Sequence, residues 1–259
     1  MYPKRCSEAD RAKLHVMQRR TLLKWTGALT LLAHPGLVRY ARGAELSAEV
    51  AGVRLPRTPL ALAAVDFARA SCPDYLFNHC MRTFLFGALL LRRQQREYRG
   101  EDAFIGAALH DLGLLPAFET PKGSFEVDGA DAAERWVRQH HGSPAQADRI
   151  WHTIELHDGK WALTLRHGPE AMLVALGAGT DVDGSAPGEL DPREIDEVIA
   201  AFPRLRFKAQ FTALLVAHCQ RKPDSQRATW LEGLCRAHAP RPAPDNAVEQ
   251  EIAAAGFSE

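Results

Sequence analysis

The most constraining feature of this sequence is an apolar run over residues 103–109 that ends in the adjacent His110 and Asp111, with Gly113 two positions later. The run predicts a buried helix, and the glycine predicts its C-terminal end. Burying a carboxylate is costly unless a positive charge lies beside it. No lysine or arginine occurs within the eight residues before Asp111 or the ten after it. A metal ion is the simplest local compensation, and a helix end with a capping histidine and a solvated aspartate is the alternative.

Charge and hydropathy exclude two classes of partner. The 259 residues include 32 Lys+Arg and 32 Asp+Glu, so the formal net charge is zero. Nucleic-acid-binding domains usually carry a basic excess, and we therefore expect no nucleic-acid partner. No apolar stretch reaches the ~18 residues that a membrane span needs, so we expect no stable membrane span. A small-molecule substrate remains the expected partner.

The N-terminal segment has the composition of a targeting signal. Residues 17–44 combine a basic start, a short apolar centre and a small-residue end, which is typical of a secretory signal. Arg19 and Arg20, followed by Leu-Leu-Lys, resemble a twin-arginine signal. We expect residues 1–44 to be a signal or N-terminal extension and the protein to be periplasmic. An amphipathic N-terminal helix on a cytoplasmic protein is the alternative.

The cysteines predict few cross-links. An exported chain would keep four cysteines in an oxidising compartment. Cys72 and Cys80 would lie about 12 Å apart along one helix, too far to bridge. Cys219 and Cys235 could meet only across a helix hairpin. We expect mostly free thiols, and the absence of a C-x-x-C spacing argues against a thiolate zinc site.

The body of the chain, residues 45–238, predicts an all-α domain of eight or nine helices. Helix starts are marked by Thr58, Ser143 and Asp191, each followed by proline. Apolar residues recur with a helical period, and no useful alternation of period two occurs. Residues 45–57 read as a linker, and residues 239–259 as a poorly ordered tail. The expected helices cover about residues 58–71, 74–96, 101–111, 124–137, 143–157, 169–180, 191–202, 205–218 and 225–235.

Four further side chains are candidates for a site. His79 lies in the first third of an amphipathic helix, where core packing is the alternative role. Glu126 opens a helix, where compensation of the helix dipole is the alternative. His157 stands at a helix end before a glycine, and Asp181 ends a small-residue stretch at the end of another helix.

The order His79, His110-Asp111, Asp181 resembles the HD superfamily of metal-dependent hydrolases. Five blocks narrow the resemblance to its cyanamide hydratase branch, in which serine usually stands at the position of Cys80. The blocks are Asn78-His79-Cys80-Met81-Arg82, Leu109-His110-Asp111-Leu112-Gly113, Ser124-Phe125-Glu126-Val127-Asp128-Gly129-Ala130, Ile154-Glu155-Leu156-His157 and Gly177-Ala178-Gly179-Thr180-Asp181-Val182.

The resemblance implies an HD-type helical bundle in which His79, His110, Asp111 and Asp181 ligate one divalent metal. Two imidazoles and two carboxylates suit Zn²⁺, with Fe²⁺ or Mn²⁺ as alternatives. Metal-bound hydroxide would then attack a small nitrile-type substrate.

The same resemblance suggests two further roles. His157 would orient the substrate or donate a proton, or would serve as a further ligand in a binuclear site. Glu126 would accept a hydrogen bond from a substrate amino group.

Two other functions remain open at this point. An HD-type phosphohydrolase would need cationic groups near the metal, and only Arg82, Lys122 and Lys160 lie near the candidate blocks. That scarcity favours a small neutral substrate. A non-catalytic helical domain that keeps a metal for stability is the other alternative.

Overall fold

The computed structural model describes residues 46–158, 161–226, 229–239 and 247–255. The chain separates into two units, Met1–Leu46 and Ser47–Glu259, and the secondary structure described here belongs to the second. The expected signal over residues 1–44 lies outside the described residues. Within the described part of the chain, no helix has both the length and the apolar character needed to cross a membrane.

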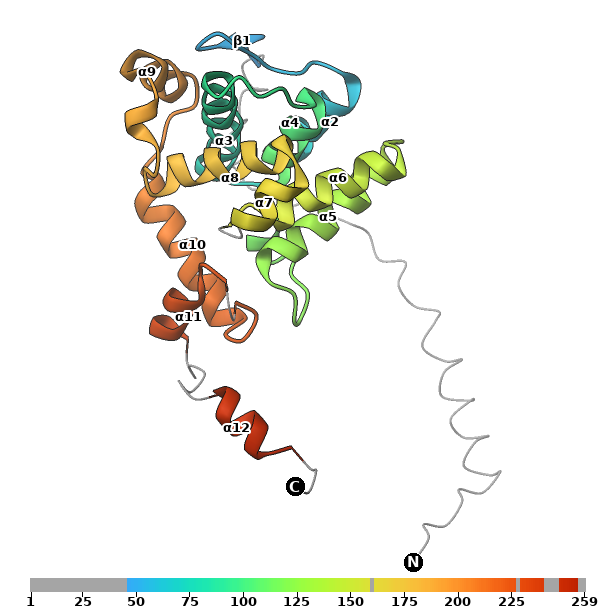
Figure 1. The fold of residues 1–259 in the computed structure, drawn as a ribbon, viewed down its shortest axis with the longest axis vertical. Helices are drawn as coiled ribbons and strands as arrows, with labels where there is room; N and C mark the ends of the chain where they lie inside the picture. The colour runs from blue at the N-terminus through green and yellow to red at the C-terminus, as the bar shows by residue number, and fades with distance from the viewer. Residues whose placement is uncertain (1–45, 159–160, 227–228, 240–246, 256–259) are drawn as a thin grey trace, which may run out of the picture. The chain divides into compact units, whose positions relative to one another are not determined.

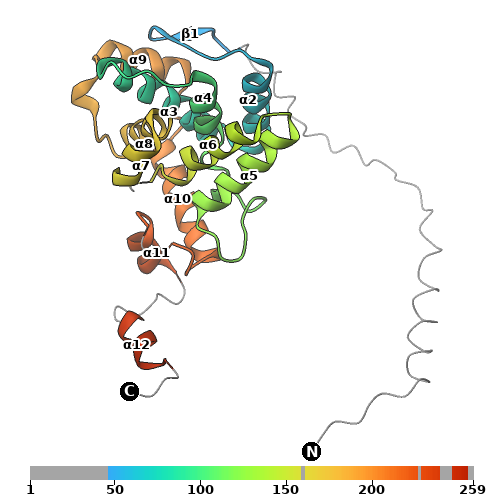
Figure 2. The same ribbon diagram turned by 45° about the vertical axis from the view of Figure 1, so that its right-hand side comes forward.

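The described fold is helical apart from one short hairpin (Figures 1 and 2), which confirms the predicted all-α class. Strands β1 (Glu49–Val50) and β2 (Val53–Arg54) pair antiparallel. The helices are α2 (Pro59–Ser71), α3 (Asp74–Arg93), α4 (Gly100–Leu109), α5 (Phe125–Gln139), α6 (Pro144–Glu155), α7 (Trp161–His167), α8 (Pro169–Val182), α9 (Pro192–Ala201), α10 (Phe207–Arg221), α11 (Glu232–His238) and α12 (Ala247–Ala253), with 3₁₀ turns η1 (Leu112–Leu114) and η2 (Pro187–Glu189).

The predicted helix starts are confirmed by their caps. Thr58 Oγ1 accepts a hydrogen bond from the Ala61 amide at 3.2 Å, and Ser143 Oγ accepts one from the Gln146 amide at 3.1 Å. Asp191 forms a full capping box at the start of α9. Such caps satisfy amide groups that have no partner inside the helix.

Several short elements differ from the expectation. The linker over residues 45–57 contains the hairpin, whose turn residues Ala51 and Gly52 both have positive φ, as a tight two-residue turn requires. Helix α7 was not expected, α11 begins at Glu232 rather than near Ser225, and the tail includes α12. Seven-residue helices and two-residue strands are too short to display a hydrophobic period.

Helices α3 and α8 cross at close range because each presents a glycine to the other (Figures 1 and 2). A Cβ on Gly87 would lie 2.1 Å from the Leu173 carbonyl oxygen, and a Cβ on Gly177 would lie 1.9 Å from the Thr83 carbonyl oxygen. The crossing therefore depends on the absence of side chains at both points. It brings the first half of α3 beside the end of α8.

A second close approach fixes the end of α4. A Cβ on Gly113, in η1, would lie 1.9 Å from the Phe125 carbonyl oxygen in the first turn of α5. Helix α4 is buried over nearly its whole length and ends at His110. The glycine thus lets α5 pack directly against the turn that follows His110 and Asp111.

The expectation of mostly free thiols is wrong for one pair. Cys219 and Cys235 form a disulfide with an S–S distance of 2.11 Å. They lie on α10 and α11, which pack together as a hairpin, the one arrangement in which the sequence spacing allowed them to meet. Cys72 and Cys80 are free and buried, as expected. The expected separation along one helix is wrong, because Cys72 lies between α2 and α3 and its side chain is hydrogen-bonded to the Cys80 thiol.

Candidate metal centre

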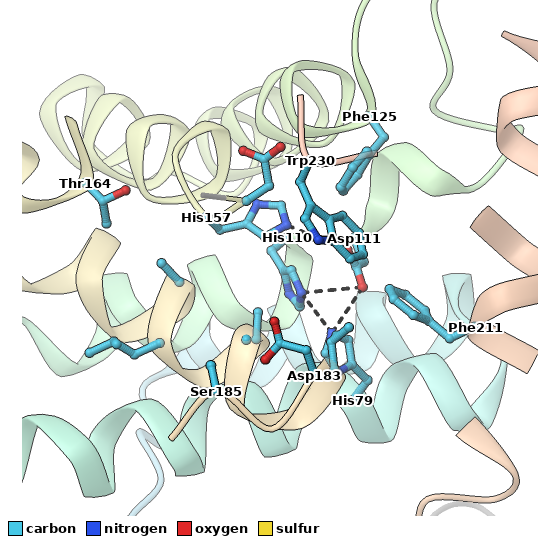
Figure 3. Close-up of a pocket in the computed structure, with 16 residues that line it drawn as sticks. His79, His110, Asp111, Phe125, His157, Thr164, Asp183, Ser185, Phe211 and Trp230 are labelled. Carbon is cyan, nitrogen blue, oxygen red and sulfur yellow. Dashed lines mark hydrogen bonds and ion pairs between the residues drawn. The ribbon is translucent and has the colours of Figure 1, made fainter. Parts of the chain in front are cut away.

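His79, His110 and Asp111 bring three ligand atoms together in a triangle (Figure 3). His79 Nε2 lies 3.3 Å from His110 Nε2, and Asp111 Oδ2 lies 3.4 Å from each of them. A tetrahedral ion with bonds of about 2.0–2.1 Å keeps its ligand atoms about 3.3–3.4 Å apart. The observed triangle matches one face of that tetrahedron, so these three buried residues could hold a metal ion.

The hydrogen bonds of the two imidazoles fix which nitrogen faces the centre. His110 Nδ1 donates to the Ala107 carbonyl at 2.8 Å, and His79 Nδ1 donates to Asp181 Oδ2 at 2.7 Å. In the neutral form of each ring, the proton therefore sits on Nδ1 and Nε2 keeps its lone pair. Outer partners of this kind orient metal-binding histidines and set their tautomer.

Two observations fit a cation at the triangle. Asp111 Oδ2 is buried without a hydrogen-bond partner among the described residues. Burial first, and then the neighbouring His157 and His79, lower the pKa of His110 to about 3 against the opposing effect of Asp111, so its ring is neutral at neutral pH. Two imidazole nitrogens and a carboxylate oxygen that face each other suit a cation between them.

Asp181 lies behind the triangle instead of within it. Besides the hydrogen bond from His79, its carboxylate accepts Arg82 Nε at 2.8 Å, Arg82 Nη2 at 2.7 Å and Arg204 Nη1 at 2.5 Å. Burial alone would raise the pKa of Asp181, but the hydrogen bonds from His79 and Arg82 hold it well below its usual range. The structure thus joins three of the four expected ligands and makes Asp181 the residue that orients His79.

His157 faces the centre from the end of α6. Its Nδ1 donates to the Ile154 carbonyl at 2.5 Å, so Nε2 carries the lone pair and points toward Asp111 Oδ1, 4.0 Å away. The rings of His157 and His110 are 4.8 Å apart. The expected place of His157 beside the metal ligands therefore agrees with the structure.

The triangle lies in the wall of a pocket of about 370 Å³ (Figure 3). The remaining described lining is mostly apolar and comes from α5, α7, α8, α10 and the segments after α6, after α8 and before α11. Asp158, Thr164, Asp183 and Ser185 supply polar groups besides His157, and no lysine or arginine lines the pocket within the described residues. Lys160 and Arg227 lie outside those residues. The largest apolar side chains in the lining are Phe125, Leu176, Val182, Phe211 and Trp230.

Glu126, the other candidate catalytic residue, is fully buried and does not line the pocket. Burial and the neighbouring Asp158 raise the pKa of Glu126 well above its ordinary value. The carboxyl oxygens of Glu126 and Asp158 are buried, and none of them has a hydrogen bond of ordinary geometry among the described residues. The raised pKa favours the protonated form of Glu126, and the neighbouring Asp158 lines the pocket.

Sequence reasoning missed three residues of the site. Asp158 directly follows His157 in the sequence, so a signal for it was present. Arg204 and Trp230 carried no signal, because their positions depend on how the chain turns after α9 and α10.

Comparison with known proteins adds no family assignment. No protein-family model matches the chain, and no match was found among characterised proteins.

Proposed function

We propose that this chain is a metal-dependent HD-type hydrolase or hydratase, similar to cyanamide hydratase, acting on a neutral nitrile-type group. One observation carries the proposal. Three metal-ligand atoms at tetrahedral spacing, from His79, His110 and Asp111, lie in the wall of an apolar pocket. Three protein ligands with one position left open is the pattern of catalytic metal sites, whereas structural sites use four.

The donor set supports Zn²⁺, with Fe²⁺ or Mn²⁺ as alternatives. Two imidazole nitrogens and one carboxylate oxygen suit each of these ions, and the 3.3–3.4 Å spacing favours tetrahedral geometry. When bound, such an ion polarises a coordinated water and brings its pKa down to about 7.

The pocket supports a neutral substrate over a phosphate ester. Transfer of a phosphoryl group favours cationic clamps. The two arginines nearest the triangle, Arg82 and Arg204, both direct their guanidinium groups to Asp181. Neither arginine lines the pocket, and its described lining contains no lysine or arginine that could bind a phosphate.

The proton transfers can be assigned to groups of this chain. Hydration of a nitrile places oxygen on the carbon and protons on the nitrogen. His157 Nε2 is unprotonated in its neutral form and can accept a proton from water. Glu126, whose raised pKa favours its protonated form, can pass a proton by way of Asp158 at the pocket wall to the substrate nitrogen.

Metal analysis combined with a substrate screen tests the proposal. We expect the purified protein to contain about one divalent ion per chain and to release urea from cyanamide or an amide from another nitrile. A His110→Ala protein should lose both metal and turnover. His152→Ala is the matched control, because His152 lies outside the pocket lining.

Other results would favour the alternatives. Turnover of phosphomonoesters without turnover of nitriles would indicate the phosphohydrolase. Bound metal with no turnover of either class, and loss of stability alone in His110→Ala, would indicate a metal-stabilised binding domain.

A further inference from the structure

The pocket is larger than a small nitrile needs. Cyanamide has three non-hydrogen atoms, while pockets of about 300–1,000 Å³ accommodate drug-sized ligands. The pocket at the metal triangle has a volume of about 370 Å³. Most of this space lies against apolar side chains. A small polar molecule would leave it filled with water that has few hydrogen-bond partners in the pocket wall.

A second hollow borders the first. Its volume is about 460 Å³, and it shares Val182, Phe211 and Trp230 with the pocket at the triangle. Its further walls come from α10 and α11 and are mainly apolar. They include Phe207, Leu215, Leu231 and Leu234.

The shared residues form the boundary between the two hollows. Phe211 is buried, whereas the Trp230 side chain is a large hydrophobic group 51% exposed to solvent. Large exposed apolar side chains that border a concave apolar surface mark binding sites. The disulfide between Cys219 and Cys235 holds the two helices that frame the second hollow, so the hollow is a built feature of the fold.

We infer that the substrate is elongated, with its reactive group at the metal triangle and a hydrocarbon portion of several carbons that passes Phe211 and Trp230 into the second hollow. This inference rests on the proposed function for the position of the reactive group. The occupant is a hydrocarbon chain because seven of the nine described lining residues of the second hollow are apolar and give a polar molecule few partners. Lys208 is the only charged residue among the described lining of the second hollow.

Straight-chain primary amides test the inference without requiring turnover. They carry the group that nitrile hydration produces, and their binding to the metal-loaded full chain can be followed by calorimetry from acetamide to octanamide. Burial of each methylene contributes ~0.8 kcal/mol, which is about a threefold to fourfold gain in affinity. We expect such a gain for each carbon through hexanamide at least.

Two protein variants test where the hydrocarbon portion of the ligand binds. Leu234→Trp narrows the second hollow and should weaken octanamide binding at least fivefold while leaving acetamide unchanged. Trp230→Ala removes an exposed part of the shared wall and should also weaken octanamide selectively. Leu163→Trp is the control for the added indole, since Leu163 is exposed and lines neither hollow.

The outcomes separate this inference from the proposed function. An affinity that does not change between acetamide and octanamide overturns the inference, as does equal weakening of both amides by the two variants. A steep chain-length series in a protein that hydrates no nitrile supports the elongated ligand and contradicts the proposed reaction.

Discussion

His79 on α3 donates its Nδ1 proton to Asp181 on α8 across 2.7 Å, although 102 positions separate the two residues. The same carboxylate accepts hydrogen bonds from Arg82, which is fully buried, and from Arg204. Asp181 therefore neutralises buried positive charge and orients a candidate metal ligand at the same time. The candidate metal centre and the packing of α3 against α8 both depend on this one side chain.

Replacing Asp181 with asparagine should weaken metal binding. Loss of a carboxylate partner behind a metal-binding histidine typically lowers affinity about 10–100-fold. The buried Arg82 would also lose its counter-charge, which costs roughly 3–5 kcal/mol of unfolding free energy. Chelator competition and urea unfolding measure the two effects. Asp66→Asn is the control, because Asp66 is exposed and belongs neither to the triangle nor to the pocket lining. Wild-type metal affinity in Asp181→Asn would show that His79 is oriented by other contacts.

Two glycine-to-alanine substitutions should have opposite signs. At Gly177 the added methyl meets the Thr83 carbonyl at the crossing of α3 and α8, and overpacking of this kind costs about 1–3 kcal/mol or more. At Gly233 in α11 nothing lies within 4 Å, so alanine should add about 0.4–1 kcal/mol by restricting the unfolded chain. Thermal unfolding of both variants checks the pair, and Gly177→Ala should also weaken metal binding because it displaces Asp181.

The sequence predicted the helical body because caps and apolar periods are local signals. It predicted His79, His110 and Asp111 because the resemblance and the buried position of Asp111 both point to a metal. It could not show that Asp181 faces away from the triangle, since that depends on Arg82 and Arg204 occupying its oxygens. The sequence could not predict the disulfide for a similar reason. The spacing of Cys219 and Cys235 permits a hairpin between α10 and α11 but does not specify one.

The metal-free protein should lose stability in acid because of His110. Burial first, and the neighbouring His157 and His79, lower its pKa from 6.5 to about 3. Between about pH 6.5 and 3, His110 is therefore protonated in the unfolded chain and neutral in the folded chain. Unfolding free energy should fall by up to ~1.4 kcal/mol per pH unit across that window. Denaturation of His110→Leu between pH 6.5 and 4 should show a shallower slope, and an equal slope would contradict the assignment.

Glu126 should produce the opposite slope. Its pKa is raised by burial and by Asp158, so the folded chain keeps a proton that the unfolded chain releases above its ordinary value of 4.5. The stability contribution is present below that value and is lost as the pH rises toward the raised pKa. Glu126→Gln should therefore exceed the wild type in unfolding free energy by an amount that grows from pH 5 to 8. Glu134→Gln, at an exposed ion pair, is the control and should show no such growth.

The two slopes oppose each other between about pH 4.5 and 6.5, so the wild type alone can look insensitive to pH in that window. Only the single variants separate the contributions. A Glu126→Gln protein that follows the wild type across this range would place an ionised carboxylate at Glu126 and remove it as a proton donor.

The Cys219–Cys235 disulfide should stabilise the hairpin that frames the second hollow. It closes a loop with a sequence separation of 16, for which the restriction of the unfolded chain amounts to about 3 kcal/mol. Reductant should lower the melting temperature of the wild type and leave a Cys219→Ala/Cys235→Ala double variant unaffected. Cys72 and Cys80 remain in both proteins, so they cannot account for a difference.

The Cys219–Cys235 disulfide also bears on the cellular compartment of the protein. Structural disulfides persist in oxidising compartments, which supports the proposal that the twin-arginine-type segment over residues 1–44 directs export. N-terminal sequencing of the native protein together with thiol titration after denaturation gives the test. A processed chain with two free thiols agrees with export and oxidation, because only Cys72 and Cys80 would react. An unprocessed chain with all five cysteines reactive would place the protein in the cytoplasm and leave α10 and α11 joined by packing alone.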